Sequence, residues 1–287
     1  MGSVERKDAA IEVRDVHYTY RDGTRALRGI DLTVAKGEKL AIMGANGSGK
    51  STLFLHLNGV LKPDKGEVIL EGTPLKYSRK ALVEARKKVG IVFQNPDNQL
   101  FSASVVQEIS FGLLNLGYGE EETLQKVNGI MEELDMAEFR EKPTHFLSGG
   151  QKKRVAIADV MVMDPEIIIF DEPTSELDPW AAALTDQIID DLSKKGTTVI
   201  LSTHNVDRAL AWADRIVLLD LGKVIAEGRP KSILGDKDLL KKTNLEEPRI
   251  MRIFRSLQRE NILDSTLEPP RTVEELEEYI EKGKREK

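Results

Sequence analysis

The residues with the clearest potential for chemistry form a glycine-rich stretch near the N-terminus: Gly44-Ala45-Asn46-Gly47-Ser48-Gly49-Lys50-Ser51. Glycines let successive backbone N–H groups turn inward around an anion, because no Cβ stands in the way. Lys50 supplies a mobile cation for the terminal phosphates of a nucleotide, and the Ser51 hydroxyl is a ligand for Mg²⁺. The spacing, Gly followed by four residues and then Gly-Lys-Ser, predicts a phosphate-binding loop.

The residues on either side give this loop the setting that the motif requires. Residues 39–43 read as a short buried strand, and residues 51–57 read as an apolar helix that leaves the loop. Such a helix directs the positive end of its dipole at the bound anion. The alternative is a glycine-rich turn that binds nothing, and the order of strand, loop and helix argues against it.

A pair of carboxylates follows a second candidate strand. Asp171 and Glu172 come directly after the apolar run 167–170, which is typical of a strand covered on both faces. Here Asp171 can hold Mg²⁺, directly or through water, and Glu172 can polarise a water for attack on a γ-phosphate. The alternative is a solvated carboxylate pair that only ends the strand. The glycine-rich loop upstream favours the catalytic interpretation.

The most specific stretch is a pentapeptide that opens a predicted helix running to about residue 163: Leu147-Ser148-Gly149-Gly150-Gln151. Small residues at a helix N-terminus present free N–H groups and a hydroxyl to an anion. Average residue frequencies make a chance match rare, on the order of one in several thousand. The pentapeptide therefore predicts a second anion-binding element.

The loop at 44–51, the pentapeptide at 147–151 and the carboxylates at 171–172 follow one another along the chain. With these three stretches, the chain resembles the ABC-type ATPases over roughly residues 10–235. The resemblance implies an α/β fold of the P-loop NTPase class, with a parallel core sheet and an antiparallel β subdomain. It also implies a helical subdomain at about residues 95–163. The expected cofactors are ATP and Mg²⁺. The expected function rests on this family resemblance, because a fold by itself does not determine function.

The same resemblance implies roles for single residues. Gln94 would reach Mg²⁺ and the attacking water, His204 would contact the γ-phosphate and hold Glu172 and the water, and Tyr20 would stack on adenine. The expected catalytic residues are Glu172, His204 and Gln94, and the expected metal ligands are Ser51, Gln94 and Asp171. The expected nucleotide-binding residues are Tyr20, Gly44, Asn46, Gly47, Ser48, Gly49, Lys50, Ser51, Thr52, Ser148, Gly149, Gly150 and Gln151.

The resemblance also implies a partner for the pentapeptide. In ABC ATPases this helix cannot reach the phosphate-binding loop of its own subunit. Two ATPase subunits close face to face, so that each ATP lies between one loop and the partner's copy of Ser148-Gly149-Gly150. We therefore expect a homodimer or a pair with a related ATPase, whose opening after hydrolysis drives a membrane partner.

A narrower resemblance points to the ATPases of energy-coupling-factor importers, which take up cobalt, nickel or vitamins. It rests on residues 93–101 and 111–117, and on the tail segments 245–248 and 269–279. It implies a transmembrane coupling subunit and a substrate-binding membrane subunit as partners. In that family the segment after Gln94 lines a groove for a helix of the coupling subunit. The alternative is that Leu100 and Phe101 are buried inside the helical subdomain.

Composition limits where the chain works. The chain has 287 residues and no cysteine, which excludes disulfides. Its formal net charge is −6, so it lacks the basic surface typical of nucleic-acid-binding proteins. Residues 1–7 lack the apolar core of a signal peptide, and no apolar run approaches the roughly 20 residues that span a bilayer. We expect a peripheral protein on the cytoplasmic face of the cell membrane.

Three other functions fit part of this pattern. A conventional ABC transporter ATPase differs mainly in the tail and in the residues after Gln94. A soluble ABC ATPase acting on DNA or ribosomes usually carries two ATPase domains or a coiled-coil insertion, and this chain has neither. A nucleotide-gated module that no longer hydrolyses ATP is disfavoured by intact Lys50, Asp171, Glu172 and His204.

The periodicity of apolar residues predicts the remaining elements. Two antiparallel strands are expected within 11–36, further strands at 66–76, 87–93 and 197–201, a hairpin at 216–226, and helices at 120–135 and after Asp178. One face of the helix 120–135 is expected to be apolar, with Leu124, Val127, Ile130, Met131 and Leu134. Residues 236–287 are expected to form a C-terminal helical extension with a capping box at Thr272 and Glu275 and an apolar stripe of Val273, Leu276 and Ile280. Two residues depart from the family pattern without explanation: Asp159 in the pentapeptide helix, and Glu176.

Overall fold

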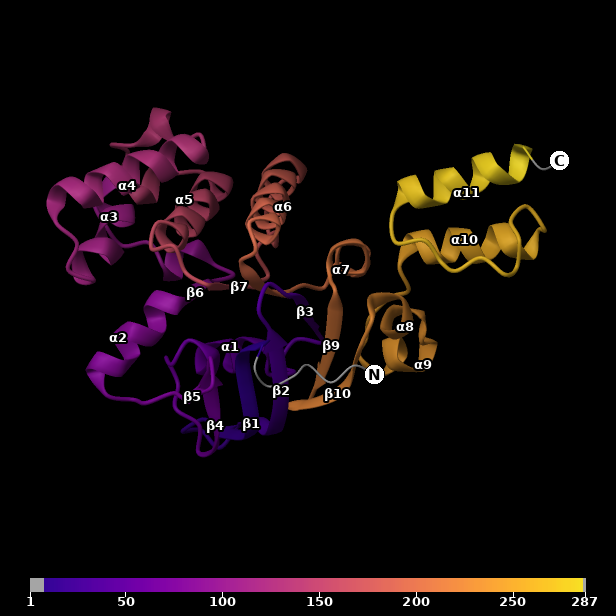
Figure 1. The fold of residues 1–287 in the computed structure, drawn as a ribbon, viewed down its shortest axis with the longest axis horizontal. Helices are drawn as coiled ribbons and strands as arrows, with labels where there is room; N and C mark the ends of the chain where they lie inside the picture. Colours follow the sequence, from indigo (N-terminus) through magenta and orange to yellow (C-terminus); the bar gives the residue numbers. More distant parts are fainter. Residues whose placement is uncertain (1–7, 286–287) are drawn as a thin grey trace.

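The computed structural model describes residues 8–285, with side chains as far as residue 282. The segment 1–7, where no signal peptide is expected, and the last two residues of the predicted extension lie outside this range. A four-stranded antiparallel sheet has the order β2-β1-β4-β5 (Figure 1). Its strands are β1 (Ala9–Thr19), β2 (Arg25–Ala35), β4 (Lys65–Leu70) and β5 (Thr73–Pro74).

The second sheet has six strands in the order β10-β9-β3-β8-β7-β6. They are β3 (Lys39–Met43), β6 (Val89–Val92), β7 (Ile167–Asp171), β8 (Thr198–Ser202), β9 (Arg215–Asp220) and β10 (Lys223–Gly228). The strands from β9 to β6 pair in parallel, and only the hairpin β9–β10 is antiparallel. All five residues of β7 are buried, as expected for a parallel strand covered on both faces. The predicted α/β class is confirmed.

The helix that leaves the phosphate-binding loop lies between the two sheets. It is α1 (Lys50–Leu57), and its buried Leu53 and Phe54 belong to the same apolar cluster as Val13 of β1 and Ile42 of β3. Along β3, Ala41 and Met43 face the other cluster, because successive side chains point to opposite sides of a sheet. This packing fixes both ends of the loop.

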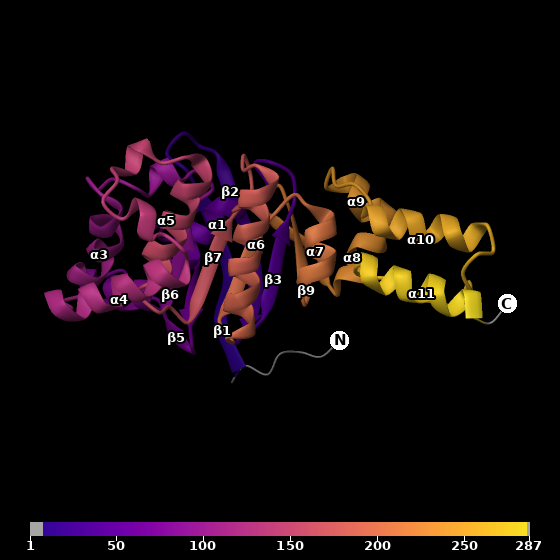
Figure 2. The same cartoon turned by 90° about the horizontal axis from the view of Figure 1, so that it is seen from above.

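The helical subdomain consists of α3 (Val105–Asn115), α4 (Glu120–Glu133) and α5 (Gly149–Met161). Figures 1 and 2 show these helices grouped at one end of the molecule. The predicted helix 120–135 is present, but its expected apolar face is wrong at Leu124, whose side chain is 48% exposed. The other expected residues of that face are buried: Val127, Ile130, Met131 and Leu134.

A helix that was not predicted from the sequence shortens a predicted strand. Residues 79–88 form α2 (Arg79–Lys88), so Lys87 and Lys88 end a helix and strand β6 begins only at Val89. The Ser78 hydroxyl caps α2 by accepting a hydrogen bond from the Ala81 N–H at 3.4 Å. Basic residues in its last turn suit the negative end of the helix dipole. The charged run gave no apolar periodicity that would have marked this helix.

The remaining helices are α6 (Pro179–Lys194), α7 (Val206–Trp212), α8 (Pro230–Gly235), α9 (Lys237–Lys242), α10 (Arg249–Arg259) and α11 (Val273–Arg285). Asp178 caps α6 as predicted, through its Oδ1 and the N–H groups of Trp180 and Ala181. Within the described residues no strand follows β10. Figures 1 and 2 show α10 and α11 side by side at the end opposite the helical subdomain.

The C-terminal extension is packed onto the main domain. Its buried Met251 and Phe254 belong to the apolar cluster that contains Leu210 of α7. The capping box at its last helix is half formed: the Thr272 hydroxyl accepts from the Glu275 N–H at 3.3 Å, while the Glu275 carboxylate accepts from the Arg271 N–H.

Candidate nucleotide-binding and hydrolysis site

The glycine-rich loop joins the carboxyl end of β3 to the first turn of α1, as the spacing predicts. Three of its glycines have positive φ values: +147° at Gly44, +78° at Gly47 and +108° at Gly49. A Cβ at Gly44 would lie 2.1 Å from the Leu219 carbonyl oxygen, and one at Gly49 would lie 2.7 Å from that of Ala26. Both positions therefore need glycine, for backbone conformation and for space.

A hollow of about 340 Å³ opens over this loop at the carboxyl ends of the parallel strands. Ligands of open α/β sheets bind at this edge. The hollow brings together residues from five separate parts of the chain, and twelve of them were expected from the sequence. Those twelve are Tyr20, Asn46, Gly47, Ser48, Gly49, Lys50, Ser51, Thr52, Gln94, Asp171, Glu172 and His204.

The Lys50 ammonium group closes the loop on itself. Its Nζ donates to the Gly44 carbonyl oxygen at 2.7 Å and to that of Ala45 at 3.3 Å. Burial lowers the pKa of Lys50, and the nearby carboxylates of Glu172 and Asp171 oppose this shift. A cation held in this way lies beside the backbone N–H groups that would cradle the phosphates.

Ser202, at the end of β8, positions both carboxylate residues. Its hydroxyl donates to Asp171 Oδ1 at 2.6 Å and accepts from the Glu172 N–H at 2.8 Å. The backbone of Glu172 has a φ of +45°, so this hydrogen bond holds a residue in the left-handed region. The role of Ser202 was not predicted from the sequence. The parallel pairing of Asp171 with Ser202 brings them together, and only the strand register could have indicated it.

His204 lies over the second carboxylate. Its Nε2 is 3.1 Å from Glu172 Oε1 and 3.0 Å from Asn46 Oδ1. Burial raises the pKa of Glu172, while the charges of His204 and Lys50 oppose the shift. A carboxylate with a raised pKa is a stronger base for a water proton. The expected contact between His204 and Glu172 is therefore present.

Tyr20 forms the aromatic edge of the hollow. Its hydroxyl lies 3.0 Å from Thr52 Oγ1, and its ring meets that of Tyr18 edge to face at a centroid distance of 5.0 Å. Tyr20 is 36% exposed, whereas Tyr18 also packs on the buried ring of His56. Tyr20 thus has a face available for a nucleobase, whereas Tyr18 is a packing residue.

The residues expected to hold Mg²⁺ fit that ion. Ser51, Gln94 and Asp171 all line the hollow, and they offer a hydroxyl, an amide oxygen and one carboxylate. Within residues 8–285 no group of three or more His, Cys, Asp or Glu side chains forms a metal site. Mg²⁺ is commonly bound by one or two carboxylates together with substrate phosphates and water, so a single carboxylate suits it.

The pentapeptide lies apart from this hollow. Ser148 and Gln151 form a capping box at the start of α5, with the Gln151 N–H donating to the Ser148 hydroxyl at 3.3 Å and the Ser148 N–H donating to Gln151 Oε1 at 3.0 Å. Ser148 and Gly149 are exposed, and no residue of 148–151 lines the hollow. The free N–H groups at this helix end therefore face outward from the subunit's own site.

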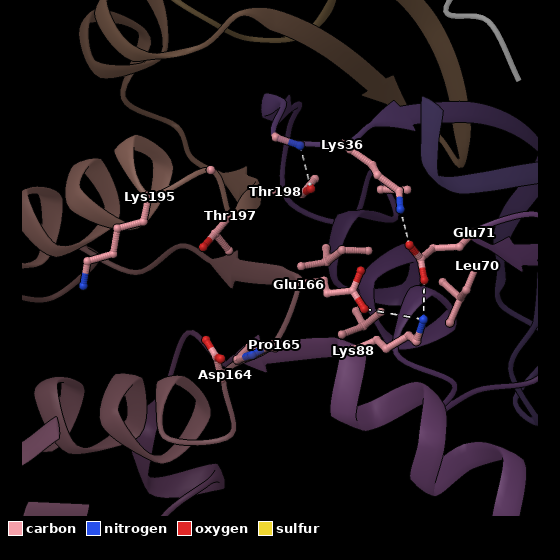
Figure 3. A pocket seen from close by; sticks show the side chains of 15 residues that line it. Lys36, Leu70, Glu71, Lys88, Asp164, Pro165, Glu166, Lys195, Thr197 and Thr198 are labelled. Carbon is pink, nitrogen blue, oxygen red and sulfur yellow. Dashed lines mark hydrogen bonds and ion pairs between the residues drawn. The ribbon is translucent and has the colours of Figure 1, made fainter. Parts of the chain in front are cut away.

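A second hollow, of about 320 Å³, lies at the opposite, amino ends of the parallel strands (Figure 3). Its ammonium groups are paired: Lys36 and Lys88 both bind Glu71, and Lys88 also lies 3.4 Å from Glu166. The charges of these two lysines are neutralised, and none of the residues expected at the site lines this hollow, so we assign the site to the first hollow.

Comparison with known proteins identifies the family. Residues 27–175 match the model of the ABC transporter family. The chain is 47% identical over 251 residues to the energy-coupling factor transporter ATP-binding protein EcfA of Methanocaldococcus jannaschii, covering 88% of this chain and 90% of the relative. The chain belongs to the ABC transporter family. EcfA of Methanococcus maripaludis is 48% identical over 255 residues, covering 89% and 92%.

Solved structures agree. CbiO1 of Clostridium perfringens, part of the ABC transporter complex cbiONQ, has a TM-score of 0.73 and 42% identity, covering 88% of this chain and 99% of that one. An ATP-binding cassette solved as a dimer with ADP and inorganic phosphate has a TM-score of 0.70 and 29% identity, covering 77% and 98%. The chain is therefore an ABC-type ATPase of the energy-coupling factor class, and the ATP-binding fold is confirmed.

Proposed function

We propose that the chain powers an energy-coupling-factor importer for a metal ion such as cobalt or nickel, or for a vitamin. The observation that carries the proposal is the convergence of Lys50, Gln94, Asp171, Glu172 and His204 on one hollow. Lys50 would bind the β- and γ-phosphates, and Glu172 would act as general base. Mg²⁺, held by Asp171 with Ser51 and Gln94, would neutralise charge on the transferred phosphoryl group.

The exposed start of α5 supports a dimeric working form. Its N–H groups and the Ser148 hydroxyl face outward, so an anion could reach them from a second subunit. We propose that two such chains, or this chain and a related ATPase, enclose two ATP molecules between them. The cassette solved as a dimer with ADP and phosphate supports this arrangement.

A groove of about 550 Å³ in the helical subdomain supports the proposal that a membrane partner binds this chain. Phe101 is 66% exposed there, and its ring meets that of Phe111 edge to face at 4.8 Å. Leu100 is partly buried against the core, whereas Phe101 is exposed. The alternative that both residues are buried inside the helical subdomain therefore fits Leu100 and not Phe101. An exposed apolar groove of this kind suits an amphipathic helix. We propose that the transmembrane coupling subunit binds here.

We propose that the chain works at the cytoplasmic face of the membrane, held there by its partners. No helix among the described residues has the length and apolar character needed to cross a bilayer. The coupling subunit and a separate substrate-binding membrane subunit would supply that part.

Co-purification of the tagged chain from membranes of its source, with mass spectrometry of the partners, tests the proposal. We expect a polytopic coupling subunit and a small membrane subunit, and the latter would identify the substrate. Recovery of a transporter with a soluble binding protein would favour a conventional importer. Recovery of ribosomes or DNA-repair factors would contradict the transport role, while the ATPase assignment would stand.

A further inference from the structure

A short segment connects the nucleotide site to the groove of the helical subdomain, and α5 holds it along its length. The segment runs from Phe93, at the end of β6, through the single helical turn η2 (Pro96–Asn98), to Phe101. Gln94, near its start, lines the nucleotide hollow, and Phe101, at its end, lines the groove. Any contact that fixes this segment therefore fixes both sites relative to α5.

Gln99 makes the central contact. Its Nε2 donates to the Ala156 carbonyl oxygen at 2.8 Å and to Asp159 Oδ2 at 3.1 Å. Its Oε1 accepts from the Phe93 N–H at 3.4 Å. One side chain thus joins the start of the segment to the middle of α5.

Lys153 and Glu108 support the two ends of the same segment. The buried Lys153 ammonium group donates to the carbonyl oxygens of Phe93 at 2.9 Å and Gln94 at 2.6 Å. At the other end, Glu108 of α3 accepts from the N–H groups of Phe101 and Ser102. The backbone on both sides of Gln99 is therefore anchored, and the Gln99 side chain spans the part between.

Among the residues that hold this segment, Asp159 is the one that departs from the family pattern. It is a partly buried carboxyl on the inner side of α5, and burial raises its pKa to about 7, with the Glu108 carboxylate acting in the same direction. Burying a carboxyl is costly unless a hydrogen bond compensates. The Gln99 amide is the donor that the structure provides. Asp159 does not line the nucleotide hollow, so ATP binding does not account for it.

We propose that Asp159, acting through Gln99, is a positioning residue that holds Gln94 in place for ATP hydrolysis. The inference rests on the proposed role of Gln94 at Mg²⁺ and the attacking water. Loss of the link would leave the phosphate-binding loop intact, because none of its residues contacts Gln99 or Asp159 in the hydrogen bonds of the described chain. It would instead let Gln94 depart from its productive position.

The test uses the purified full-length chain and four variants: Asp159→Ala, Asp159→Asn, Gln99→Ala and the Asp159→Ala/Gln99→Ala double substitution. We expect Asp159→Ala and Gln99→Ala each to lower kcat about tenfold, with KM for ATP changed less than about twofold. Asp159→Asn keeps an oxygen acceptor for Gln99 and should restore most of the activity. The double variant should lose no more than either single one, because the two residues act as a unit.

A matched pair elsewhere separates positioning from general damage. On α6, Gln187 Nε2 donates to Asp191 Oδ1 at 2.9 Å, which is the same pair of groups on an exposed surface. Asp191→Ala should leave kcat unchanged. Equal melting temperatures for all folded variants would exclude unfolding as the cause. If Asp159→Ala fails to fold, Gln99→Ala and Asp159→Asn carry the test.

The outcomes distinguish this inference from the proposed function. Unchanged kcat in Gln99→Ala, additive losses in the double variant, or a loss in Asp159→Asn as large as in Asp159→Ala would overturn the positioning role. Gln94→Ala is measured beside them. If it keeps full activity, the proposed role of Gln94 is wrong. If it loses activity while Gln99→Ala does not, the role of Gln94 stands and only the link fails.

Discussion

At the scale of single residues, the site depends on how burial and hydrogen bonds tune a few side chains. Glu172 lies in a left-handed backbone conformation, its N–H is held by Ser202, and His204 lies 3.1 Å from its carboxylate. Its pKa is raised by burial, which makes it a better base. These contacts agree with a general base that is held still and kept partly away from bulk water.

Replacing the proposed base tests this directly. Glu172→Gln should lower kcat by at least about a thousandfold, since the amide cannot take a proton from water, while the affinity for ATP stays within a few fold. Steady-state phosphate release and equilibrium nucleotide binding would measure the two effects. Normal turnover in this variant would show that another group activates the water.

The residues that the sequence identified share one property: each stands in a contiguous motif or at a strand end that a family pattern fixes. Ser202 was missed because its importance depends on the pairing of β7 with β8, which brings it opposite Asp171. Asp159 was noticed but not explained, because its partner Gln99 is 60 residues away along the chain. Local chemistry can be read from a sequence, whereas cross-strand and interhelix partners require the fold.

At the scale of elements, an ion cluster ties the antiparallel sheet to the amino ends of the core strands. Glu71, between β4 and β5, binds Lys36 and Lys88, and these cations lower its pKa from 4.5 to about 2 (Figure 3). Lys88 ends α2 and also lies beside Glu166, which precedes β7. The end of β2, the turn between β4 and β5 and the end of α2 therefore meet at one carboxylate that is 23% exposed, and Lys88 links them to the start of β7.

The lowered pKa gives a pH dependence with a definite sign. The stabilisation from Glu71 is fully present above pH 4.5 and is lost as the pH falls through about 2, because the unfolded chain binds the proton first. Glu71→Gln should lower the free energy of unfolding by about 1–2 kcal/mol at pH 7, allowing for screening, and by much less near pH 2. Denaturant unfolding at several pH values would measure this.

An exposed pair serves as the control for that experiment. Glu84 lies 3.1 Å from Lys87 on the surface of α2, and its side chain is 60% exposed. Glu84→Gln should change stability by less than about 0.5 kcal/mol, as is usual for surface ion pairs. Equal effects of both substitutions at pH 7 would contradict the special role of Glu71.

The Arg271 guanidinium group attaches the C-terminal extension to the end of α7, in addition to a hydrogen bond from the Arg249 N–H to Asp207 Oδ1 at 2.8 Å. Arg271 donates to the carbonyl oxygens of Leu210 at 2.8 Å, Ala211 at 3.1 Å and Ala213 at 2.5 Å. These groups end α7 and have no further turn to bond to. Arg271→Ala should lower the free energy of unfolding by about 1–3 kcal/mol and make the extension more sensitive to protease.

The ATPase rate should stay within about twofold in Arg271→Ala, because the contact lies far from the nucleotide hollow in the fold. Arg259→Ala is a suitable control, since Arg259 is exposed and its guanidinium contacts only the neighbouring Ser256 hydroxyl within α10. A protease pattern unchanged by Arg271→Ala would show that the remaining contacts hold the extension without this guanidinium group.

Helices and strands were predicted well where apolar runs were long, and poorly where most residues of the element are charged. The strands of both sheets and the helices α4, α5 and α6 were expected from the sequence. Helix α2 was missed because only Ala85 among its ten residues is buried, so its sequence has little apolar periodicity. Val273 and Leu124 were both expected on buried apolar stripes, but both are exposed. Periodicity does not show this, since the packing of neighbouring elements decides which edge of an apolar stripe is covered.

At the scale of the whole molecule, the subunit presents separately the two elements that we propose bind phosphate. The loop lines the hollow, and the start of α5 faces outward. With ATP, the slow variant Glu172→Gln should elute as a dimer of twice 32.1 kDa. Adding Ser148→Arg should keep it monomeric, because a bulky cation would occupy the place of the partner's γ-phosphate. Light scattering after gel filtration would measure the mass.

Ser265→Arg, in the exposed connection between α10 and α11, adds the same side chain away from this surface and should still dimerise. A dimer that persists in the Ser148→Arg variant would place the subunit interface elsewhere on the molecule.

The burial of Lys50 has one more consequence, which concerns protons in solution. Its pKa lies below the usual lysine value because burial disfavours the charge, and a bound polyphosphate would restore the charged form. At alkaline pH, ATP binding should therefore take up protons from the buffer. Calorimetric titration in buffers of different ionisation enthalpy should give heats that diverge as the pH rises. Identical heats in all buffers would mean that Lys50 stays fully charged before the nucleotide arrives.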